Sequence, residues 1–233
     1  MSRFLDPGYT SGERLRTSGN LNAFAKLPRM ALIPLFRDEA RRRGLLGEDE
    51  RVTAEVAFRL VRDMPYRRAS DRQPETVIRE WTGTCSGKHY LLAALLEELG
   101  FATMVILVTH EFTPENSPWL PPHLLAQVAE RPVPDVHTFL RIQHERVRDE
   151  WMTVDATWPA AAARLGMPVN LVFEVGEDQQ IACDPIEIFH VPEDEDPQAL
   201  KERVIAYHAG DQADRRDAFI EALSEWLAAE LGG

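Results

Sequence analysis

The sequence predicts an α+β fold in which helices flank a mostly antiparallel β-sheet. Three observations lead to this prediction. Apolar residues recur at helical spacing towards both ends of the chain, runs rich in β-branched residues gather in the middle, and no internal repeat or low-complexity tract interrupts them. Residues 1–233 are therefore expected to form one domain, with a core of about residues 74–190, a helical N-terminal arm at 1–73 and C-terminal helices at 196–231.

The N-terminal arm is predicted to be irregular before about Leu27 and helical afterwards. Residues 32–43 and 49–64 carry apolar side chains at helical spacing, and a glycine or a proline follows each segment. Residues 74–81 begin with a proline, which is favoured in the first turn of a helix. They are predicted to form a short helix that leads into the core.

Strand patterns follow residue 100. Residues 102–109 form a β-branched run that is typical of a buried strand. Residues 135–142 and 150–157 are expected to form a hairpin across a polar turn, and residues 169–175 and 181–190 a second strand pair. These strands make up the predicted sheet.

A long insertion at residues 110–134 separates the first predicted strand from the second. It holds six prolines and a short helical pattern at 123–130, so it is a candidate surface loop or lid beside a site. At the other end of the chain, Asp196 and Pro197 begin a helix that ends near Gly210, and an apolar stripe then predicts a last helix.

Composition excludes several classes of function. The chain has 26 Lys plus Arg against 38 Asp plus Glu, a net charge of −12, which argues against nucleic-acid or anionic-membrane binding. It has no apolar run of about eighteen residues and no apolar signal core at the N-terminus, so we expect a cytoplasmic protein with reduced thiols. The two cysteines, Cys85 and Cys183, form no CxxC pair, and no metal site, disulfide framework or cofactor is expected.

The stretch from Trp81 to Gly100 draws most attention. A glycine-containing loop delivers Cys85 to the first turn of an amphipathic helix, with Thr84 as the expected N-cap and Gly100 just past the end. The helix dipole and the unpaired N–H groups at that position favour a thiolate, which is the nucleophilic form of cysteine. A small buried cysteine without chemistry is the alternative for Cys85, and it is the interpretation we give to Cys183.

A base and an orienting group are predicted on the 135–157 hairpin. If Ile142 faces Glu150, the same register places His137 directly opposite Asp155. Opposed residues of antiparallel strands have Cβ atoms about 4.5–5.5 Å apart on one face, so the carboxylate would fix the imidazole tautomer. The other ring nitrogen would then be free to exchange a proton with a thiol. This interpretation depends on the strand register.

Three further residues are weaker candidates. The backbone N–H of Cys85 is a natural oxyanion donor, and the Trp81 indole is a candidate second donor. Trp158 is a candidate wall of a substrate groove, and Lys88 a candidate for lowering the pKa of Cys85. Packing explains the two tryptophans better than a site role does, and solvation explains Lys88 equally well. The histidines other than His137 that stand without a partner by spacing are interpreted as structural: His89, His110, His144 and His190.

Three blocks of sequence resemble the transglutaminase-like superfamily. They are Gly83-Thr-Cys-Ser-Gly-Lys88 with the leucine-rich run after it, His137-Thr-Phe-Leu, and Trp151-Met-Thr-Val-Asp-Ala-Thr-Trp158. The resemblance covers about residues 81–159. It implies a papain-like core, with the cysteine helix packed on an antiparallel sheet, and it implies Cys85 as nucleophile, His137 as general base and acid, and Asp155 as orienting residue.

The sequence therefore favours a thiol enzyme that transfers acyl groups through a Cys85 thioester. Its expected partner is a peptide, a protein or another amide, and hydrolysis ranks above protein cross-linking because no calcium loop or large docking domain is evident. An arylamine N-acetyltransferase-like activity ranks lower, since nothing marks a coenzyme A site. The alternative from another class is a catalytically silent transglutaminase-like fold that serves as a binding or scaffold module. The sequence does not specify the oligomeric state.

Overall fold

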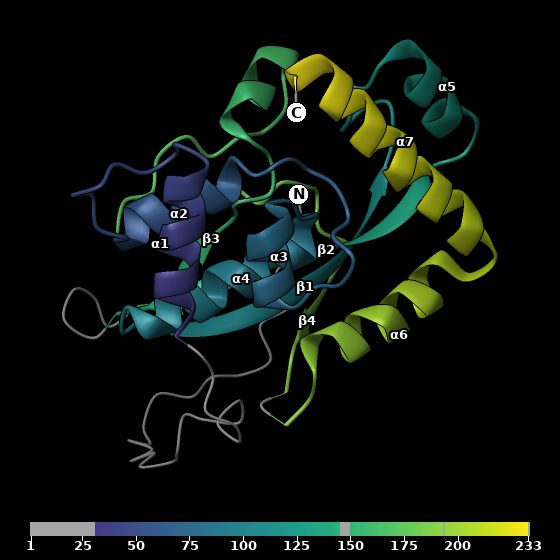
Figure 1. Ribbon diagram of the computed structural model, residues 1–233. Helices are drawn as coiled ribbons and strands as arrows, with labels where there is room; N and C mark the ends of the chain where they lie inside the picture. The colour runs from purple at the N-terminus through teal and green to yellow at the C-terminus, as the bar shows by residue number, and fades with distance from the viewer. Residues whose placement is uncertain (1–30, 145–149, 193, 233) are drawn as a thin grey trace.

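The structure is a computed structural model that describes residues 31–144, 150–192 and 194–232, and it has the predicted α+β architecture (Figure 1). The predicted irregular segment before Leu27 lies outside the described residues. The helices are α1 (Leu32–Arg42), α2 (Ala54–Arg62), α3 (Pro74–Glu80), α4 (Cys85–Glu98), α5 (Pro122–Glu130), α6 (Pro197–Ala209) and α7 (Ala213–Leu231), with 3₁₀ turns η1 (Ala160–Leu165) and η2 (Gly210–Gln212). The strands are β1 (Ala102–Phe112), β2 (Val133–Gln143), β3 (Met152–Val154) and β4 (Glu187–His190).

The described strands form one antiparallel sheet with the order β3-β2-β1-β4. β1 and β2 are its long central pair, matched from Ala102 opposite Gln143 to Phe112 opposite Val133. The strands predicted at 102–109 and 135–142 are confirmed, and both extend towards the insertion between them.

Helix α4 lies at the centre of the larger hydrophobic core. Its leucines pack against Leu140, Ile142 and Val154 of the sheet, while α1, α2 and α3 pack on its other sides. The sequence predicts a single apolar face for this helix, but the run from Leu91 to Leu96 is buried all round. Gly100 follows the helix at φ +90°, a conformation that glycine adopts without strain.

The C-terminal helices form a second layer along the sheet (Figure 1). α6 packs on the strands through Val204, which contacts Leu107 and Val136. α7 lies beside α5, and both contribute apolar residues to a second core. The C-terminal helices predicted from the sequence are confirmed.

The 110–134 insertion is a packed part of this second core. Its first residues extend β1, its last residues begin β2, and Leu120, Leu124 and Val128 between them are buried. The helix predicted at 123–130 is present as α5. Because its apolar side chains pack in the second core, the segment is not an exposed loop.

The prediction of a second strand pair, at residues 169–175 and 181–190, is wrong. Residues 169–175 form no strand, and within 181–190 only β4 is one, pairing with β1. No further strand pairs with β3, because side chains already bind the backbone N–H groups to which such a strand would have paired. The N–H of Thr153 donates to Asp178 Oδ1 at 2.6 Å, and the N–H of Asp155 donates to Gln179 Oε1 at 2.8 Å.

None of the helices in the described part of the chain is long and apolar enough to cross a membrane.

Candidate active site

Cys85 is the first residue of α4, as the sequence predicts. Thr84 is the N-cap residue, but its side chain makes no capping hydrogen bond, so the N–H groups of the first turn lack that partner. The preceding turn needs Gly83, because a Cβ atom there would lie 3.1 Å from the backbone nitrogen of Lys88. The thiol therefore stands at the positive end of the helix dipole, and the residue is only 4% exposed.

His137 and Asp155 form a buried pair beside this cysteine. Nε2 of His137 donates to Oδ2 of Asp155 at 2.7 Å. The carboxylate is fixed by two backbone donors as well, the N–H of Ala182 at 2.8 Å and that of Thr157 at 3.0 Å. Since Nε2 is engaged, Nδ1 is the ring nitrogen left for the thiol.

The predicted hairpin register is wrong by two residues. Ile142 pairs with Met152 rather than Glu150, so His137 is not directly opposite Asp155. β3 stops at Val154, and Asp155 reaches His137 diagonally from just beyond the strand. The pair still meets because side chains alternate with a period of two, and an even shift leaves both residues on one face.

The electrostatics of the pair favour charge separation. Burial raises the pKa of the Cys85 thiol, but the Lys201 cation and the hydrogen bond with His137 outweigh it and lower the value to about 5. Burial lowers the pKa of His137, but the Asp155 carboxylate and Cys85 raise it to about 10. Burial also raises the pKa of Asp155, yet the His137 charge holds it well below its usual range. Between these two pKa values the thiolate and the imidazolium coexist.

Lys201 of α6 is a site residue that the sequence interpretation missed. Its Nζ donates to Cys85 Sγ at 3.3 Å, to Ser86 Oγ at 2.7 Å and to Thr138 Oγ1 at 3.0 Å. The residue is 2% exposed. A signal was present, because Lys201 stands between Pro197 and Val204 on the buried stripe of its helix, where a charge is unexpected.

Arg216 and Asp135 form a second buried ion pair near the sulfur. Nε and Nη2 of Arg216 donate to Asp135 Oδ1 at 2.8 and 2.5 Å. Arg216 likewise stands on the apolar stripe of α7, one turn before Phe219 and Ile220. With the thiolate and Asp155 as the other anions, and His137 and Lys201 as the other cations, positive and negative groups balance in this buried cluster.

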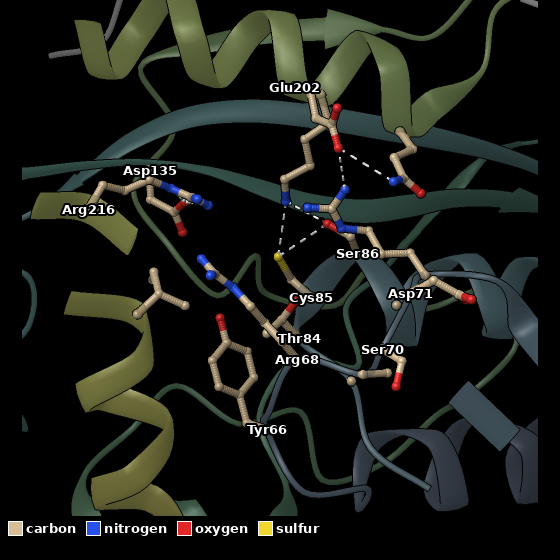
Figure 2. Close-up of a pocket in the computed structure, with 17 residues that line it drawn as sticks. Tyr66, Arg68, Ser70, Asp71, Thr84, Cys85, Ser86, Asp135, Glu202 and Arg216 are labelled. Carbon is tan, nitrogen blue, oxygen red and sulfur yellow. Dashed lines mark hydrogen bonds and ion pairs between the residues drawn. The ribbon is translucent and has the colours of Figure 1, made fainter. Parts of the chain in front are cut away.

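A cavity of about 280 Å³ opens beside Cys85 (Figure 2). Its wall is formed by residues between 66 and 72, residues 83–87, Asp135 of β2, and residues of α6 and α7. No residue of the predicted lid at 110–134 lines the cavity. Two ion pairs join its sides, Arg68 with Asp217 at 2.7 Å and Arg72 with Glu202 at 3.0 Å.

Tyr66 presents an unused polar group to this cavity. Its hydroxyl points inward (Figure 2) and makes no hydrogen bond to the described residues, although the side chain is almost fully buried. Burial and the negative charge of Cys85 raise its pKa, so it remains a donor. The hydroxyl is therefore positioned to bind an acceptor atom of a ligand.

The structure does not bring the three weaker candidates to the cavity. Trp81 stacks on Phe36, with ring centroids 5.4 Å apart, and Trp158 packs behind Tyr66 at 4.6 Å. Nζ of Lys88 donates to two buried main-chain carbonyls, of Arg62 at 2.8 Å and of Thr157 at 2.9 Å, and so is not solvated. None of the three side chains lines the cavity, and it is Lys201 rather than Lys88 that contacts the sulfur.

His89 has partners that its spacing did not reveal. Its Nδ1 donates to the carbonyl of Cys85 at 2.7 Å, and its Nε2 accepts from the N–H of Ala156 at 2.9 Å. Burial lowers the pKa of His89 to about 4, which keeps the ring neutral. It joins the start of α4 to the segment after β3, and so fixes the cysteine relative to Asp155.

Cys183 follows Ala182, whose N–H binds Asp155, but it does not line the cavity. It is half-buried against Ile106, Val108 and Phe139, and burial raises the pKa of its thiol. The described residues contain no group of three or more His, Cys, Asp or Glu side chains arranged to hold a metal ion. No protein-family model matches this sequence, and comparison with curated proteins finds no match.

Proposed function

We propose that the protein is a cysteine-dependent acyl-transfer enzyme with a papain-like core of the transglutaminase-like type. The observation that carries the proposal is a thiol at a helix N-terminus beside a buried His137–Asp155 pair joined at 2.7 Å. Nucleophile, base and orienting carboxylate in that arrangement are the parts that thiol acyl transfer needs. The resemblance of residues 81–159 to that superfamily agrees with these roles.

In the first step the Cys85 thiolate attacks the carbonyl carbon of an amide. A C–S bond forms, and the carbonyl electron pair moves onto oxygen, towards the N–H of Cys85. When the C–N bond breaks, the leaving amine takes its proton from Nδ1 of His137. Asp155 holds the ring in position throughout, and a thioester at Cys85 remains.

In the second step His137 accepts a proton from the incoming acceptor. Water yields a carboxylic acid, and an amine yields a new amide; in both cases the thiolate leaves again. Hydrolysis of a peptide or other amide is the preferred outcome, because most residues around the cavity are polar or charged and suit an aqueous acceptor. The Tyr66 hydroxyl is available to bind the substrate.

The pH dependence of thiol alkylation tests the proposal. Full-length protein is treated with iodoacetamide between pH 4 and 10, and labelling of Cys85 and Cys183 is followed separately by peptide mass spectrometry. We expect Cys85 to react with a midpoint near its pKa of about 5. Cys183 serves as an internal control and should react only at high pH.

A panel of peptides, glutamine amides and arylamides then identifies the substrate. Cys85→Ala and His137→Ala should abolish turnover while leaving the fold intact by circular dichroism. A Cys85 thiol that titrates near the free-cysteine value of about 8.5, with no turnover, would contradict the enzyme. Such a result favours the binding module, with which the 4% exposure of Cys85 is also compatible.

A further inference from the structure

Lys201 of α6 contacts the sulfur of Cys85, the first residue of α4. We propose that Lys201 is a fourth catalytic residue: it first stabilises the Cys85 thiolate and then donates to the oxyanion that forms on the substrate. The role rests on the proposed acyl transfer. The observation behind it is that Nζ lies 3.3 Å from the reacting sulfur while two other acceptors fix its position.

The ammonium group has three N–H donors, and the structure supplies three acceptors. Ser86 Oγ and Thr138 Oγ1 take two of them, and their hydroxyls lie 3.3 Å apart. The third N–H is thereby aimed at Sγ. These acceptors come from α4 and β2, so the lysine of α6 is fixed relative to the nucleophile and to the strand that carries His137.

The negative charge that Lys201 faces moves only a short way during the reaction. When the sulfur attacks the carbonyl carbon of the substrate, the negative charge passes to the oxygen bonded to that carbon. A small rotation of one N–H bond of Lys201 can follow the charge. The other two hydrogen bonds need not break. A preorganised cation in a buried site strongly stabilises such an intermediate. Lys201 thus gives the oxyanion a second hydrogen-bond donor besides the N–H of Cys85.

A comparison with Lys88 shows that Lys201 differs from a lysine that is merely buried. Lys88 belongs to α4 and Lys201 to α6, and both are buried. Lys88 donates to main-chain carbonyls and does not line the cavity, whereas Lys201 lines the cavity and contacts the sulfur. The charged groups that face Nζ of Lys201 are Cys85 on α4, Asp135 on β2 and Arg216 on α7. Asp135 and Arg216 form an ion pair and largely cancel each other's charge, which leaves the thiolate as the main counter-charge of Lys201.

The test compares Lys201→Met with Lys88→Met in the full-length protein. For Lys201→Met we expect the iodoacetamide midpoint of Cys85 to rise by about one pH unit or more. We expect kcat/KM for the identified amide substrate to fall by about 100-fold or more. Lys88→Met should lower the melting temperature and shift the midpoint much less than Lys201→Met does, because Lys88 makes no hydrogen bond to the sulfur. Lys201→Arg retains the charge and should keep the midpoint within about half a unit of the wild type.

Two results would overturn the role of Lys201. Unchanged midpoint and turnover in Lys201→Met would show a structural lysine. Faster alkylation and turnover would show that Lys201 blocks the sulfur. In both cases the proposed function still stands if wild-type turnover requires Cys85. The proposed function itself is refuted if Cys85 of the wild type has an ordinary midpoint and the protein shows no turnover.

If Lys201→Met does not fold, Thr138→Val decides the question. Valine has nearly the shape of threonine but removes one acceptor that aims the ammonium group. We expect kcat/KM to fall by about tenfold while the midpoint, set by a charge that remains, shifts little. An unchanged kcat/KM in a folded Thr138→Val protein would contradict the claim that Lys201 acts as an oriented donor to the oxyanion.

Discussion

Asp155 holds His137 through a carboxylate that two backbone N–H groups also bind. Asp155→Asn keeps the shape but removes the charge, and its NH₂ group must face either the imidazole or one of those N–H donors. We expect the pKa of His137 to fall towards the ordinary value of 6.5, because the anion that raises it is gone. Turnover should drop on the order of 100-fold or more.

Nitrogen-15 NMR titration of the imidazole measures this pKa directly, and steady-state kinetics measures the loss of turnover. A His137 ring that titrates in Asp155→Asn as it does in the wild type would show that the carboxylate does not set its charge. The Asp178→Asn variant is a suitable control, since Asp178 binds the same chain segment through Thr153 without contacting the imidazole.

The cysteine–histidine pair also makes a defined contribution to stability as pH changes. The thiol pKa is lowered from 9.0 to about 5, so its contribution is present at high pH and lost as pH falls from 9 towards 5. The His137 pKa is raised from 6.5 to about 10, so its contribution is present at low pH and lost as pH rises between those values. The two slopes oppose each other between pH 6.5 and 9.

We therefore expect the pair's contribution to rise from about pH 5 to 6.5, stay level to about 9, and then fall. The measurement is the difference in melting temperature between the wild type and the Cys85→Ala/His137→Ala double variant. The contributions of most other titrating groups cancel in this difference. A difference that does not vary with pH would mean that no ion pair forms.

The three residues of the proposed triad could be predicted because each has a local signal. A glycine-flanked cysteine before a leucine-rich helix marks a helix start, and period-two alternation keeps His137 and Asp155 on one face even though the register was wrong by two. Lys201 and Arg216 could not be assigned in this way. Each stands out only as a charge on an apolar stripe, and its partner lies on a distant element.

At the scale of the elements, the junction between α3 and α4 depends on Trp81. This residue ends α3 in a left-handed conformation, φ 55°, and its ring is buried against Phe36. We expect Trp81→Phe to lower the free energy of unfolding by about 1–2 kcal/mol through lost packing, and to retain turnover. Urea denaturation and kinetics measure the two effects. Loss of turnover at unchanged stability would instead point to the indole as an oxyanion donor.

Helices could be predicted more securely than the edges of the sheet. Glycine and proline mark helix ends in this sequence, and the C-terminal helices follow such signals. The segments 169–175 and 181–186 carry apolar residues typical of strands but form none. Side chains of Asn170, Asp178 and Gln179 bind the backbone of Gln180, Thr153 and Asp155 instead, and Gln179 also binds the backbone of Val172. The apolar pattern alone does not distinguish a side-chain partner from a neighbouring strand.

At the scale of the whole molecule, two ion pairs close the cavity between residues 66–72 and the C-terminal helices. Both are partly exposed, so salt should screen them. At pH 8, where the Cys85 thiol is already ionised, we expect about 1 M NaCl to speed labelling by a bulky maleimide roughly twofold or more. The Arg72→Ala/Glu202→Ala variant should label faster at low salt and respond less to added salt. Equal rates under all conditions would show that these pairs do not limit access.

The sulfur and the lysine that contacts it are separated by 116 positions in the chain. A ribosome makes the cysteine, the imidazole and the carboxylate well before it makes α6, and domains fold only when their segments have emerged. Until the last two helices dock, Cys85 lacks the cation that contributes most to its ionisation. In the proposed enzyme, the thiol therefore gains its full nucleophilicity only after α6 and α7 have docked.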